Sequence, residues 1–505
     1  MELAKLLQKT IIDNNLNQTS FAKSINSTQA QVSDWLANKS KPNYENLRNI
    51  AKVYKIDAND LLDIKNNKTI KFIDLFSGLG GIRIGFEQAC KELGYDSQCV
   101  LTSEIKESAV NTLTKNFPNE KIVGDIRTID ANSIPDFDYL LAGFPCQAFS
   151  TAGKGLGFLD TRGTLFFEIE RILKEKSPSG FVLENVEGLI THDRQNPTDK
   201  IGRTFKTILE SLENLGYIVT WQLIDSQFHG VAQSRKRVYI VGTKTNKVSL
   251  DLNKENKKTF QEIKETGLPC VQSHFTKCLL THYSPNQLYG KAIKDKRGGE
   301  TNIHSWDIGL KGELSKDQIF LLNQLFKERR KKHWAEEIGI DWMDGMPLTL
   351  DQIRTFNNSE NLFEMLEDMV NKKYLVKEHP KKKVKIKIDD ALTEVRQQDT
   401  TKPIGYNIVA GKLSFEFTKI LDDRDISPTL VAMDASKLGV VDGNGIRHLS
   451  LREGLRLFGY PEWYSLEHFN NKKDIAKAYD LLGNTVIIPV IKKVSQQLLK
   501  TTKKG

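Results

Sequence analysis

The sequence predicts an α/β protein with a doubly wound parallel sheet, preceded by an all-helical part and interrupted by a long mixed region. Three observations support this prediction. The first 66 residues carry only helical patterns, strand-like runs alternate with helices from Lys71 onward, and this alternation stops between residue 244 and about residue 425. A chain of 505 residues is also too long for one hydrophobic core, so several domains are expected.

Residues 1–66 contain short helices separated by a tight turn. TSFAKSI predicts one helix, Asn26-Ser27 a turn, and TQAQVSDWLAN a second helix with Val32, Trp35 and Leu36 on its inner face. This arrangement resembles the helix-turn-helix of Cro and related repressors. In that family the second helix lies in the major groove of DNA, so the resemblance presents three side chains to base edges: Gln29, Gln31 and Ser33. The alternative is a helical cap without a role in DNA binding.

Residues 70–243 alternate between strands and helices. The short runs KFIDLF, QCVLTSE, DYLLAGF, GFVLENV and RVYIVG are separated by helical stretches such as GTLFFEIERILKEK. This alternation predicts a parallel sheet with helices on both faces, whose ligands gather at the carboxyl ends of the strands. An α/β character returns after residue 445, and residues 465–500 are expected to complete this domain.

Residues 244–464 form a separate region with a large charged insertion. Helices followed by a strand, a His-Pro-Lys turn and a basic strand predict a winged-helix insertion. Two basic runs, KERRKKH at 327–333 and HPKKKVKIK at 379–387, concentrate positive charge in a chain of net charge +9. Such clusters indicate a polyanionic partner.

Several classes of protein are excluded by composition and spacing. No apolar run approaches the roughly 20 residues needed to cross a bilayer, and the opening MELAKLLQKTIIDNN lacks a signal-peptide core, so a cytoplasmic protein with no membrane partner is expected. Five cysteines without a CxxC pair argue against a disulfide framework. Cys270, His274, Cys278 and His282 recur every four residues. Neither a helix nor a strand would let all four surround one zinc ion, so no metal site is expected.

The loop DLFSGLGG, which follows the first strand and opens a helix, is a candidate cofactor site. Gly78 and Gly80 allow a tight turn and a close approach of a ligand to the helix N-terminus. Glu104 ends the second strand, where it can accept both ribose hydroxyls, and Asp125 ends the third, where it can accept from an adenine amine. A nicotinamide nucleotide is an alternative. However, no lysine or arginine lies in the loop before Arg83 to meet a diphosphate, which favours an adenosyl ligand without phosphates such as S-adenosylmethionine.

Cys146 is the candidate nucleophile. It lies in GFPCQAFSTAG, directly after the apolar run YLLAGF. A structural cysteine would normally lie inside the apolar run, whereas a cysteine in the loop after a strand can meet a ligand.

These segments, taken in order, resemble one family. DLFSGLGG, GFPCQAFS, ENV at 184–186, QSRKR at 233–237, RHLSLREGLRLFGYP at 447–461 and LGNTV at 482–486 follow one another as in DNA cytosine-5 methyltransferases of bacterial restriction-modification systems. The resemblance covers roughly residues 71–243 and 425–495. It implies a Rossmann-like, S-adenosylmethionine-dependent domain and identifies residues 244–464 as a target recognition domain.

The resemblance also implies roles for individual residues. Cys146 would add to carbon 6 of a cytosine flipped out of double-stranded DNA, Glu184 would act at ring N3, and Asn185 would position the loop. Arg235 and Arg237 would contact the carbonyl oxygen of the base and support the catalytic loop or a phosphate. The family pattern adds contacts to the cofactor from Phe76, Ile126, Pro145, Leu165, Asn484 and Val486. It adds contacts to DNA from Gln147, Ser150 and Thr429.

The resemblance implies a monomer on the target site and protection of DNA from a cognate restriction endonuclease. The helix-turn-helix is an addition to the minimal plan of the family and predicts repression of the protein's own operon, with a dimer through residues 1–66 left open. The motifs leave two other functions open. A tRNA cytosine methyltransferase would share Cys146 and Glu184 but should lack the repressor-like part, and a pure transcription regulator should carry a damaged PCQ or ENV motif.

Overall fold

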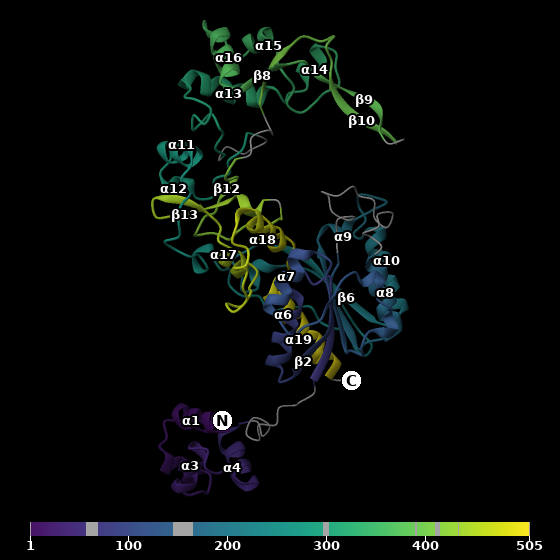
Figure 1. Ribbon diagram of the computed structural model, residues 1–505, viewed down its shortest axis with the longest axis vertical. Coiled ribbons are helices and arrows are strands. Elements are labelled where there is room, and N and C mark those ends of the chain that lie inside the picture. Colours follow the sequence, from purple (N-terminus) through teal and green to yellow (C-terminus); the bar gives the residue numbers. More distant parts are fainter. Residues whose placement is uncertain are drawn as a thin grey trace. The chain divides into compact units, whose positions relative to one another are not determined.

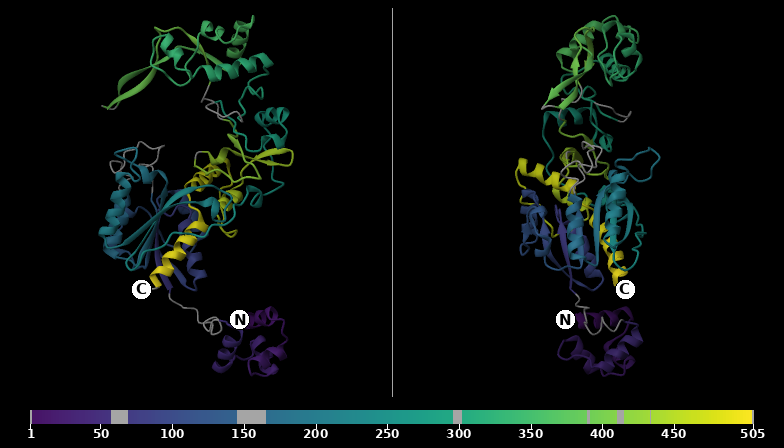
Figure 2. Two further views of the ribbon diagram at one scale, coloured as in Figure 1. Left: turned by 180° about the vertical axis from the view of Figure 1, so that it is seen from behind. Right: turned by 90° about the vertical axis from the view of Figure 1, so that its right-hand side faces the viewer.

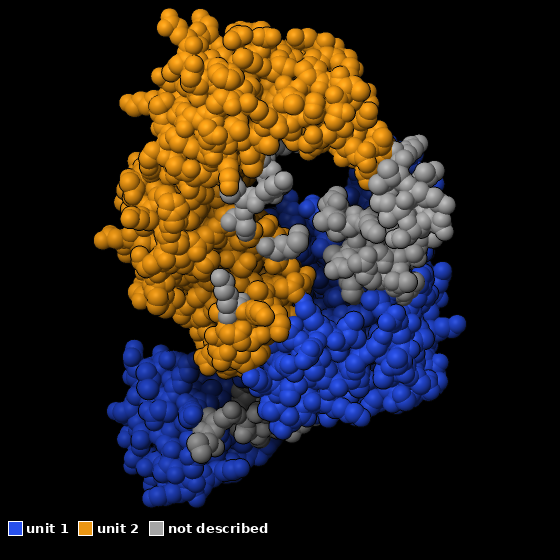
Figure 3. Space-filling view, turned by 45° about the horizontal axis from the view of Figure 1, so that its top comes forward, with its two compact units in different colours: residues 1–225, 236–254, 486–505 blue, residues 226–235, 255–485 orange. Residues whose placement is uncertain are grey.

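The computed structural model describes residues 2–56, 69–144, 165–295, 302–388, 391–409, 415–432 and 434–503. The chain forms two compact units (Figure 3), one from residues 1–225, 236–254 and 486–505, and the other from residues 226–235 and 255–485. Within the described ranges, no helix is long and apolar enough to cross a membrane.

The N-terminal part of the chain folds around a small core of its own. Its helices are α1 (Glu2–Asp13), α2 (Gln18–Ser24), α3 (Gln29–Leu36) and α4 (Tyr44–Tyr54) (Figure 1). Asn26, with a φ of +55°, makes the left-handed turn between α2 and α3. Val32 and Trp35 are buried in the core of this part, and Leu36 packs against it. The predicted helix-turn-helix is therefore confirmed, with the predicted inner face.

A seven-stranded sheet forms the centre of the first unit. Its strand order is β3-β2-β1-β4-β5-β7-β6, and the strands are β1 (Thr69–Leu75), β2 (Asp96–Ser103), β3 (Ile122–Val123), β4 (Tyr139–Gly143), β5 (Gly180–Val186), β6 (Ile218–Asp225) and β7 (Lys236–Thr243). The pairs among β1 to β5 are parallel, as expected. However, β7 is antiparallel to both of its neighbours, β5 and β6. The expectation of a wholly parallel sheet was therefore wrong at this strand, because a short connection joins β6 to β7 as neighbours and leaves no room for a crossover helix.

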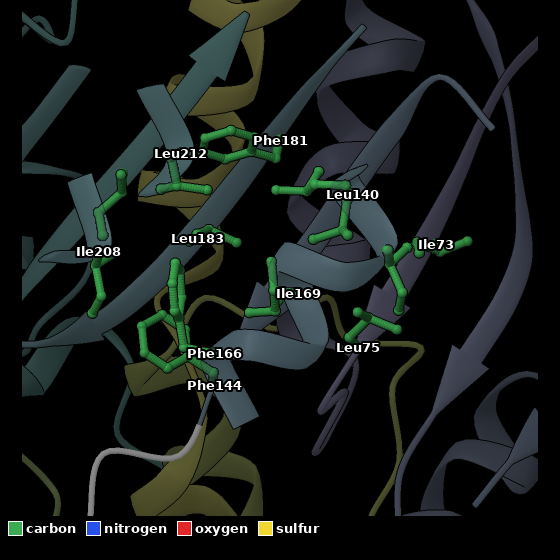
Figure 4. Close-up of a cluster of buried hydrophobic side chains, with 14 of the residues drawn as sticks. Ile73, Leu75, Leu140, Phe144, Phe166, Ile169, Phe181, Leu183, Ile208 and Leu212 are labelled. Carbon is green, nitrogen blue, oxygen red and sulfur yellow. The ribbon is translucent and has the colours of Figure 1, made fainter. Parts of the chain in front are cut away.

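Helices cover both faces of this sheet because successive strand residues point to opposite sides. On one face, Ile73, Leu75, Leu140, Phe181 and Leu183 pack against α8 (Leu165–Lys176) and α10 (Arg203–Asn214) (Figure 4). On the other face, Phe72 and Tyr139 each contact the ring of Phe86 in α6 (Gly81–Glu92). The first unit also contains α7 (Glu107–Asn116), which follows β2, and the short helix α9 (Gly188–Thr191), which follows β5. The doubly wound α/β fold is confirmed.

The last helix, α19 (Ile488–Lys503), returns to the sheet of the first unit and packs along α6. Gly85 makes this close approach possible, because a Cβ at this position would lie only 2.7 Å from the Cβ of Ile491. Tyr139 of β4 shares a 2.6 Å hydrogen bond with the hydroxyl of Thr502. The end of the chain thus completes the α/β layer.

The second unit contains a small sheet and several short helices. Its sheet has the order β12-β13-β14, and its elements outside the insertion are α11 (His274–His282), α12 (Pro285–Leu288), β12 (Lys419–Ile420), β13 (Leu438–Asp442), β14 (Gly445–His448), α17 (Leu451–Leu457) and α18 (Lys472–Asn484). Arg447 is buried between Asp442 and Glu453, with N–O distances of 2.8 Å to each. These ion pairs, together with hydrogen bonds, raise the pKa of Arg447. Glu453 is therefore a structural residue of the second unit.

The insertion of the second unit has the element order of a winged helix. Helices α13 (Lys316–Glu328), α14 (His333–Glu337), α15 (Leu350–Arg354) and α16 (Leu362–Asn371) precede β8 (Leu375–Glu378), and β11 (Gly405–Ile408) pairs with β8. Leu348 also forms an isolated antiparallel bridge to Tyr406 of β11. Between β8 and β11, β9 (Lys381–Ile388) and β10 (Ala391–Gln398) form a separate two-stranded sheet (Figure 2). The winged-helix expectation agrees with this order of elements.

The division into units differs from the boundaries that the sequence predicts. Residues 244–254 stay with the sheet, whereas residues 226–235 and α18 join the second unit, so the C-terminal completion starts at Val486 and not at residue 465. Close packing around α18 explains the difference. A Cβ at Gly454 would lie 2.7 Å from Leu482, and one at Gly483 would lie 2.1 Å from the backbone of Ala432.

Candidate active site

The glycine-rich loop at the end of β1 has the open backbone expected of a ligand cradle. Phe76, Gly78 and Gly80 have φ values of +56°, +53° and +69°, which is the left-handed region that favours glycine. A Cβ at Gly78 would meet no atom within 4 Å, whereas one at Gly80 would lie 3.1 Å from the ring of Phe117. The loop thus packs on one side and stays open at Gly78. The non-glycine Phe76 is in a sparsely populated conformation that is often associated with functional sites.

Glu104 braces this loop from the end of β2. One carboxylate oxygen accepts a 2.8 Å hydrogen bond from the backbone N–H of Gly78. The other accepts 2.8 Å hydrogen bonds from the N–H groups of Ile105 and Lys106. A carboxylate offers about four acceptor positions, so Glu104 can hold the loop and still accept from a ligand hydroxyl.

Asp74 is a charged group at the end of β1 to which the sequence analysis gave no role. Its side chain is 1% exposed, and neither carboxylate oxygen has a hydrogen-bond partner among the residues that the structure describes. Burial raises the pKa of Asp74 to about 7. A buried polar group without a partner is rare in native proteins and points to a functional role. The motif DLF could have indicated it, since an acid inside an apolar strand run is unusual.

Asp125 and Ile126 follow β3 but are already engaged. Both carboxylate oxygens of Asp125 accept from Arg127, at distances of 2.5–3.0 Å, and these hydrogen bonds hold the pKa of Asp125 below its usual range. The side chain of Ile126 is 2% exposed and belongs to the hydrophobic core. A ligand that binds the Asp125 carboxylate would therefore have to displace Arg127, and it could contact Ile126 only through the backbone.

Arg83, the first cation after the loop, is not available to a phosphate. Its guanidinium makes ion pairs of 2.8 Å with Glu87 and 2.6 Å with Glu120 and lies 4.0 Å from the centroid of the Phe117 ring. These partners outweigh burial and raise the pKa of Arg83. The site therefore offers carboxylates and backbone N–H groups to a ligand, without a free cation from the described loop.

The ends of β4 and β5 bring the ENV motif against the segment that leads to Cys146. The register pairs Gly143 with Glu184, and the side-chain amide of Asn185 donates a 3.1 Å hydrogen bond to the carbonyl oxygen of Phe144. Arg237 of β7 makes an ion pair with Glu184, with an Nε–Oε1 distance of 3.1 Å. Glu184 is 8% exposed. Asn185 thus positions the start of the loop, and Glu184 and Arg237 form a buried charged pair beside it.

Arg235 has a different environment from the one expected. It is 3% exposed, and its terminal nitrogens donate to three carbonyl oxygens, those of Leu430 at 2.8 Å, Gly483 at 3.0 Å and Thr485 at 2.9 Å. These hydrogen bonds give Arg235 a supporting position that joins segments of the second unit. The predicted roles of Arg235 and Arg237 in catalysis stay predictions.

Within the second unit, residues 233–235 of the QSRKR motif contact Thr429 and Leu430. Gln233 is fully buried, accepts from the backbone N–H of Leu430 and donates to the carbonyl oxygen of Leu457. Thr429 donates a 2.6 Å hydrogen bond to the carbonyl oxygen of Ser234. Asn484 ends α18 with an exposed side chain that donates to Asp480, and Val486 is buried in the first unit. Hydrogen bonds therefore join the segments around Gln233, Thr429 and Leu457 within the second unit.

Four predicted site residues lie outside the described residues: Pro145, Cys146, Gln147 and Ser150. Leu165 is the first residue of α8 and is half-buried. Among the described residues, no group of three or more His, Cys, Asp or Glu side chains could hold a metal ion. Cys278 and His282 lie on α11, whereas the Cys270 thiol contacts the carbonyl oxygen of Asp442.

Comparisons with known proteins agree with this geometry. Residues 70–500 match the family described as C-5 cytosine-specific DNA methylase, and residues 7–61 match a helix-turn-helix family. The type II methyltransferase M.NlaIV of Neisseria lactamica is 56% identical over 432 residues, which cover 86% of this chain and 99% of that protein. M.NgoBV of Neisseria gonorrhoeae, also a type II methyltransferase, is 55% identical with the same coverage. Among solved structures, the Entamoeba histolytica methyltransferase EhMeth is 14% identical with a TM-score of 0.47, over 86% of this chain and 99% of that chain.

Proposed function

The chain belongs to the family of C-5 cytosine-specific DNA methylases, and from this premise we propose that it methylates carbon 5 of a cytosine flipped out of a specific duplex site, with S-adenosylmethionine as the methyl donor. The observation that carries the proposal is the arrangement at the ends of β4 and β5. Glu184 is held by Arg237, and Asn185 binds the carbonyl oxygen of Phe144, two residues before Cys146.

The residues around the glycine-rich loop fit an adenosyl donor. S-adenosylmethionine, when bound, supplies a methyl group on a positively charged sulfur. Gly78 leaves room for close approach, Glu104 has acceptor capacity for ribose hydroxyls, and the buried Asp74 offers a carboxylate to positive charge. Because the Arg83 guanidinium is paired with Glu87 and Glu120, it is not available to bind a diphosphate. This argues against a nicotinamide nucleotide as the ligand.

Cys146 acts as the nucleophile in this proposal. Carbon 5 of cytosine is a weak nucleophile because the ring is aromatic. When the Cys146 thiolate bonds to carbon 6, the electron pair of the 5,6 double bond becomes available at carbon 5 to form the bond to the methyl group. Loss of the proton on carbon 5 then restores the double bond and releases the thiolate from carbon 6, so the enzyme is regenerated.

Glu184 and Arg237 act on the ring during this addition. The negative charge that the thiolate brings to the pyrimidine is stabilised if ring N3 is protonated or hydrogen-bonded, and Glu184 would supply this contact in its protonated form, since an ionised carboxylate only accepts hydrogen bonds. Arg237 orients Glu184 and would place a positive charge near the carbonyl oxygen of the base. The contact between Glu184 and Arg237 keeps both groups in one geometry.

The base must leave the helix for this chemistry. A cytosine stacked in a duplex cannot receive a thiol on one face and a methyl group on the other, so flipping is required at a cost of a few kcal/mol. Gln147 and Ser150, on the loop after Cys146, would contact the flipped nucleotide, and Thr429 would contact DNA beside it. The biological outcome would be protection of DNA from a cognate restriction endonuclease.

Trapping with a modified substrate tests this mechanism. The full-length protein, incubated with S-adenosylmethionine and a target duplex that contains 5-fluorocytosine, should form a covalent adduct, because fluorine at carbon 5 cannot leave as a proton does. Cys146→Ala should abolish the adduct and methyl transfer while DNA binding survives. An adduct on Cys146→Ala, or methylation of the exocyclic nitrogen in the digested product, would exclude the mechanism. Competition between duplex DNA and tRNA for labelled methyl groups separates the tRNA alternative.

A second function is favoured by the N-terminal part. Helix α3 exposes Gln29, whose amide donates a 3.2 Å hydrogen bond to Gln18 at the start of α2, and residues 7–61 match a helix-turn-helix family. We propose that this part binds DNA upstream of the gene and represses its own operon. An electrophoretic shift with that DNA tests the proposal, and unchanged binding after deletion of residues 1–66 would exclude it.

A further inference from the structure

The winged-helix insertion has its charges separated between two elements. Helix α16 is the helix that follows the α15–α16 turn and would enter the major groove in a helix-turn-helix docking mode. Its sequence, LFEMLEDMVN, carries three acidic residues and no basic residue, whereas β9, KKKVKIKI, carries five lysines and no acidic residue. The usual recognition helix is therefore negative and the ribbon is positive.

The charged groups on and around α16 disfavour contact between this helix and the DNA backbone. Glu364 and the large side chain of Phe363 are exposed, Phe363 to 49%. The neighbouring cations neutralise acids of the same helix, since Lys372 pairs with Asp368 at 2.7 Å and Lys377 pairs with Glu367 at 2.6 Å. These lysines are engaged within the fold, and the exposed acid of α16 would repel phosphates.

The ribbon β9–β10 bears a repulsive pair that folding alone does not explain. The register places Lys383 directly opposite Arg396, and both side chains are exposed. Like charges directly opposite each other on adjacent strands are destabilising. Glu394 offsets part of this repulsion through a 2.7 Å ion pair with Lys383. The ribbon also forms a sheet of only two strands, which is marginally stable by itself.

We propose that the β9–β10 ribbon, through Lys383 and Arg396, binds the sugar-phosphate backbone of the duplex substrate, and that α16 does not contact DNA. A polyanion removes the repulsion between Lys383 and Arg396, and a two-stranded ribbon has the dimensions to lie in the major groove. Phosphate contacts position the duplex without reading its sequence. This proposal rests on the proposed function only in taking duplex DNA as the substrate.

The salt dependence of binding tests the ribbon directly. Lys383→Gln combined with Arg396→Gln removes two cations from the ribbon, and Lys316→Gln combined with Arg354→Gln removes two exposed cations from α13 and α15 of the same insertion. The dissociation constant of each full-length protein is measured on a target duplex between low and moderate salt. Loss of two phosphate contacts should reduce the slope of log Kd against log salt by about 1.8. The control pair should retain the parent slope.

Further readouts separate DNA contact from a structural effect. The ribbon variant should keep the melting temperature of the parent, because the substitutions remove the like-charge pair together with the exposed Lys383–Glu394 ion pair, and these two small effects oppose each other. Glu364→Gln should leave the affinity unchanged. An unchanged slope in the ribbon variant, an equal loss in the control pair, or weaker binding by Glu364→Gln would overturn the proposal. Failure of the parent protein to methylate DNA would instead count against the proposed function, since binding is measured without turnover.

Discussion

At the scale of single residues, the buried carboxyl of Asp74 makes stability depend on pH. Burial raises its pKa from 3.8 to about 7, so the folded protein holds the proton more tightly than the unfolded chain does. The stabilisation from this proton is complete below about pH 4 and is lost as the pH rises through about 7, with an upper limit of about 4 kcal/mol.

Asp74→Asn removes this dependence. The melting temperature of the variant relative to the parent should rise between pH 5 and pH 8, because only the parent must place a charge in the core. Thermal melting of both proteins across this range measures the difference. A constant difference between the two proteins would show that Asp74 does not titrate there.

Arg235 and Arg237 lie two positions apart in the sequence, and substitutions of these two residues should have different effects. Arg235→Gln leaves the carbonyl oxygens of Leu430, Gly483 and Thr485 without their donors, so we expect a loss of about 3 kcal/mol in stability. Arg237→Gln should lower kcat at least 10-fold, because it removes the partner of Glu184. Melting curves and methyl-transfer rates of the two variants should therefore separate, and a variant of Arg237 with the parent's kcat would contradict the assignment.

At the scale of elements, the contact between α6 and α19 depends on a missing side chain. Gly85→Ala places a methyl group 2.7 Å from the Cβ of Ile491 and 3.0 Å from the carbonyl oxygen of Ile488, so the two helices must separate, at a cost of about 1–3 kcal/mol. Ile491→Ala also destabilises the protein, by leaving a cavity. Ile491→Ala keeps the Cβ but removes Cγ2, which also lies 2.7 Å from the added methyl group. The double variant should therefore be somewhat more stable than the sum of the two single effects predicts, and simple additivity in melting experiments would contradict this contact.

Helix α3 carries two glutamines with different hydrogen-bond partners, Gln29 and Gln31. The side-chain oxygen of Gln31 accepts from the backbone N–H of Thr28 and from the hydroxyl groups of Ser27 and Thr28. Bidentate recognition of adenine needs both the oxygen and the nitrogen of an amide, so Gln31 is less suited to reading bases than Gln29.

The two glutamines therefore predict different phenotypes. Gln31→Ala should destabilise the N-terminal part by about 1 kcal/mol. Gln29→Ala should weaken binding to the upstream DNA at least 10-fold without this loss of stability. Circular dichroism melting and electrophoretic shifts distinguish the two, and equal effects on binding would contradict the separation.

At the scale of the whole molecule, residues 2–56 carry a core of their own, and the methylase family covers residues 70–500. Removal of residues 1–66 should therefore leave methyl transfer to the target duplex within about twofold of the parent, while binding to upstream DNA is lost. Methylation assays and electrophoretic shifts on the truncated and full-length proteins measure both effects. A truncated chain that no longer methylates DNA would show that the two activities are coupled.

Much of the architecture could be predicted because its signals are local. The alternation of strands and helices predicted the doubly wound sheet, and the turn at Asn26 predicted the N-terminal helix pair. The His-Pro-Lys turn predicted strands on either side, β8 and β9, but not their partners β11 and β10. Hydrophobic periodicity and turn residues act within a few positions of the chain, so one sequence displays them. The direction of β7 and the unit to which α18 belongs depend on contacts between distant segments.

By itself, the sequence determined which residue types are present for the chemistry, because the motifs around Gly78, Cys146 and Glu184 are contiguous and ordered along the chain. Only the tertiary structure decided which charged side chains remain available. Arg235 and Arg237 look equivalent in QSRKR, yet burial directs one to three carbonyl oxygens and the other to Glu184. The acid inside the apolar run of β1 was visible in the sequence, but the burial of Asp74 and the rise of its pKa came only with the packed sheet. Burial and pairing are properties of segments brought together in space, and spacing along the chain does not encode them.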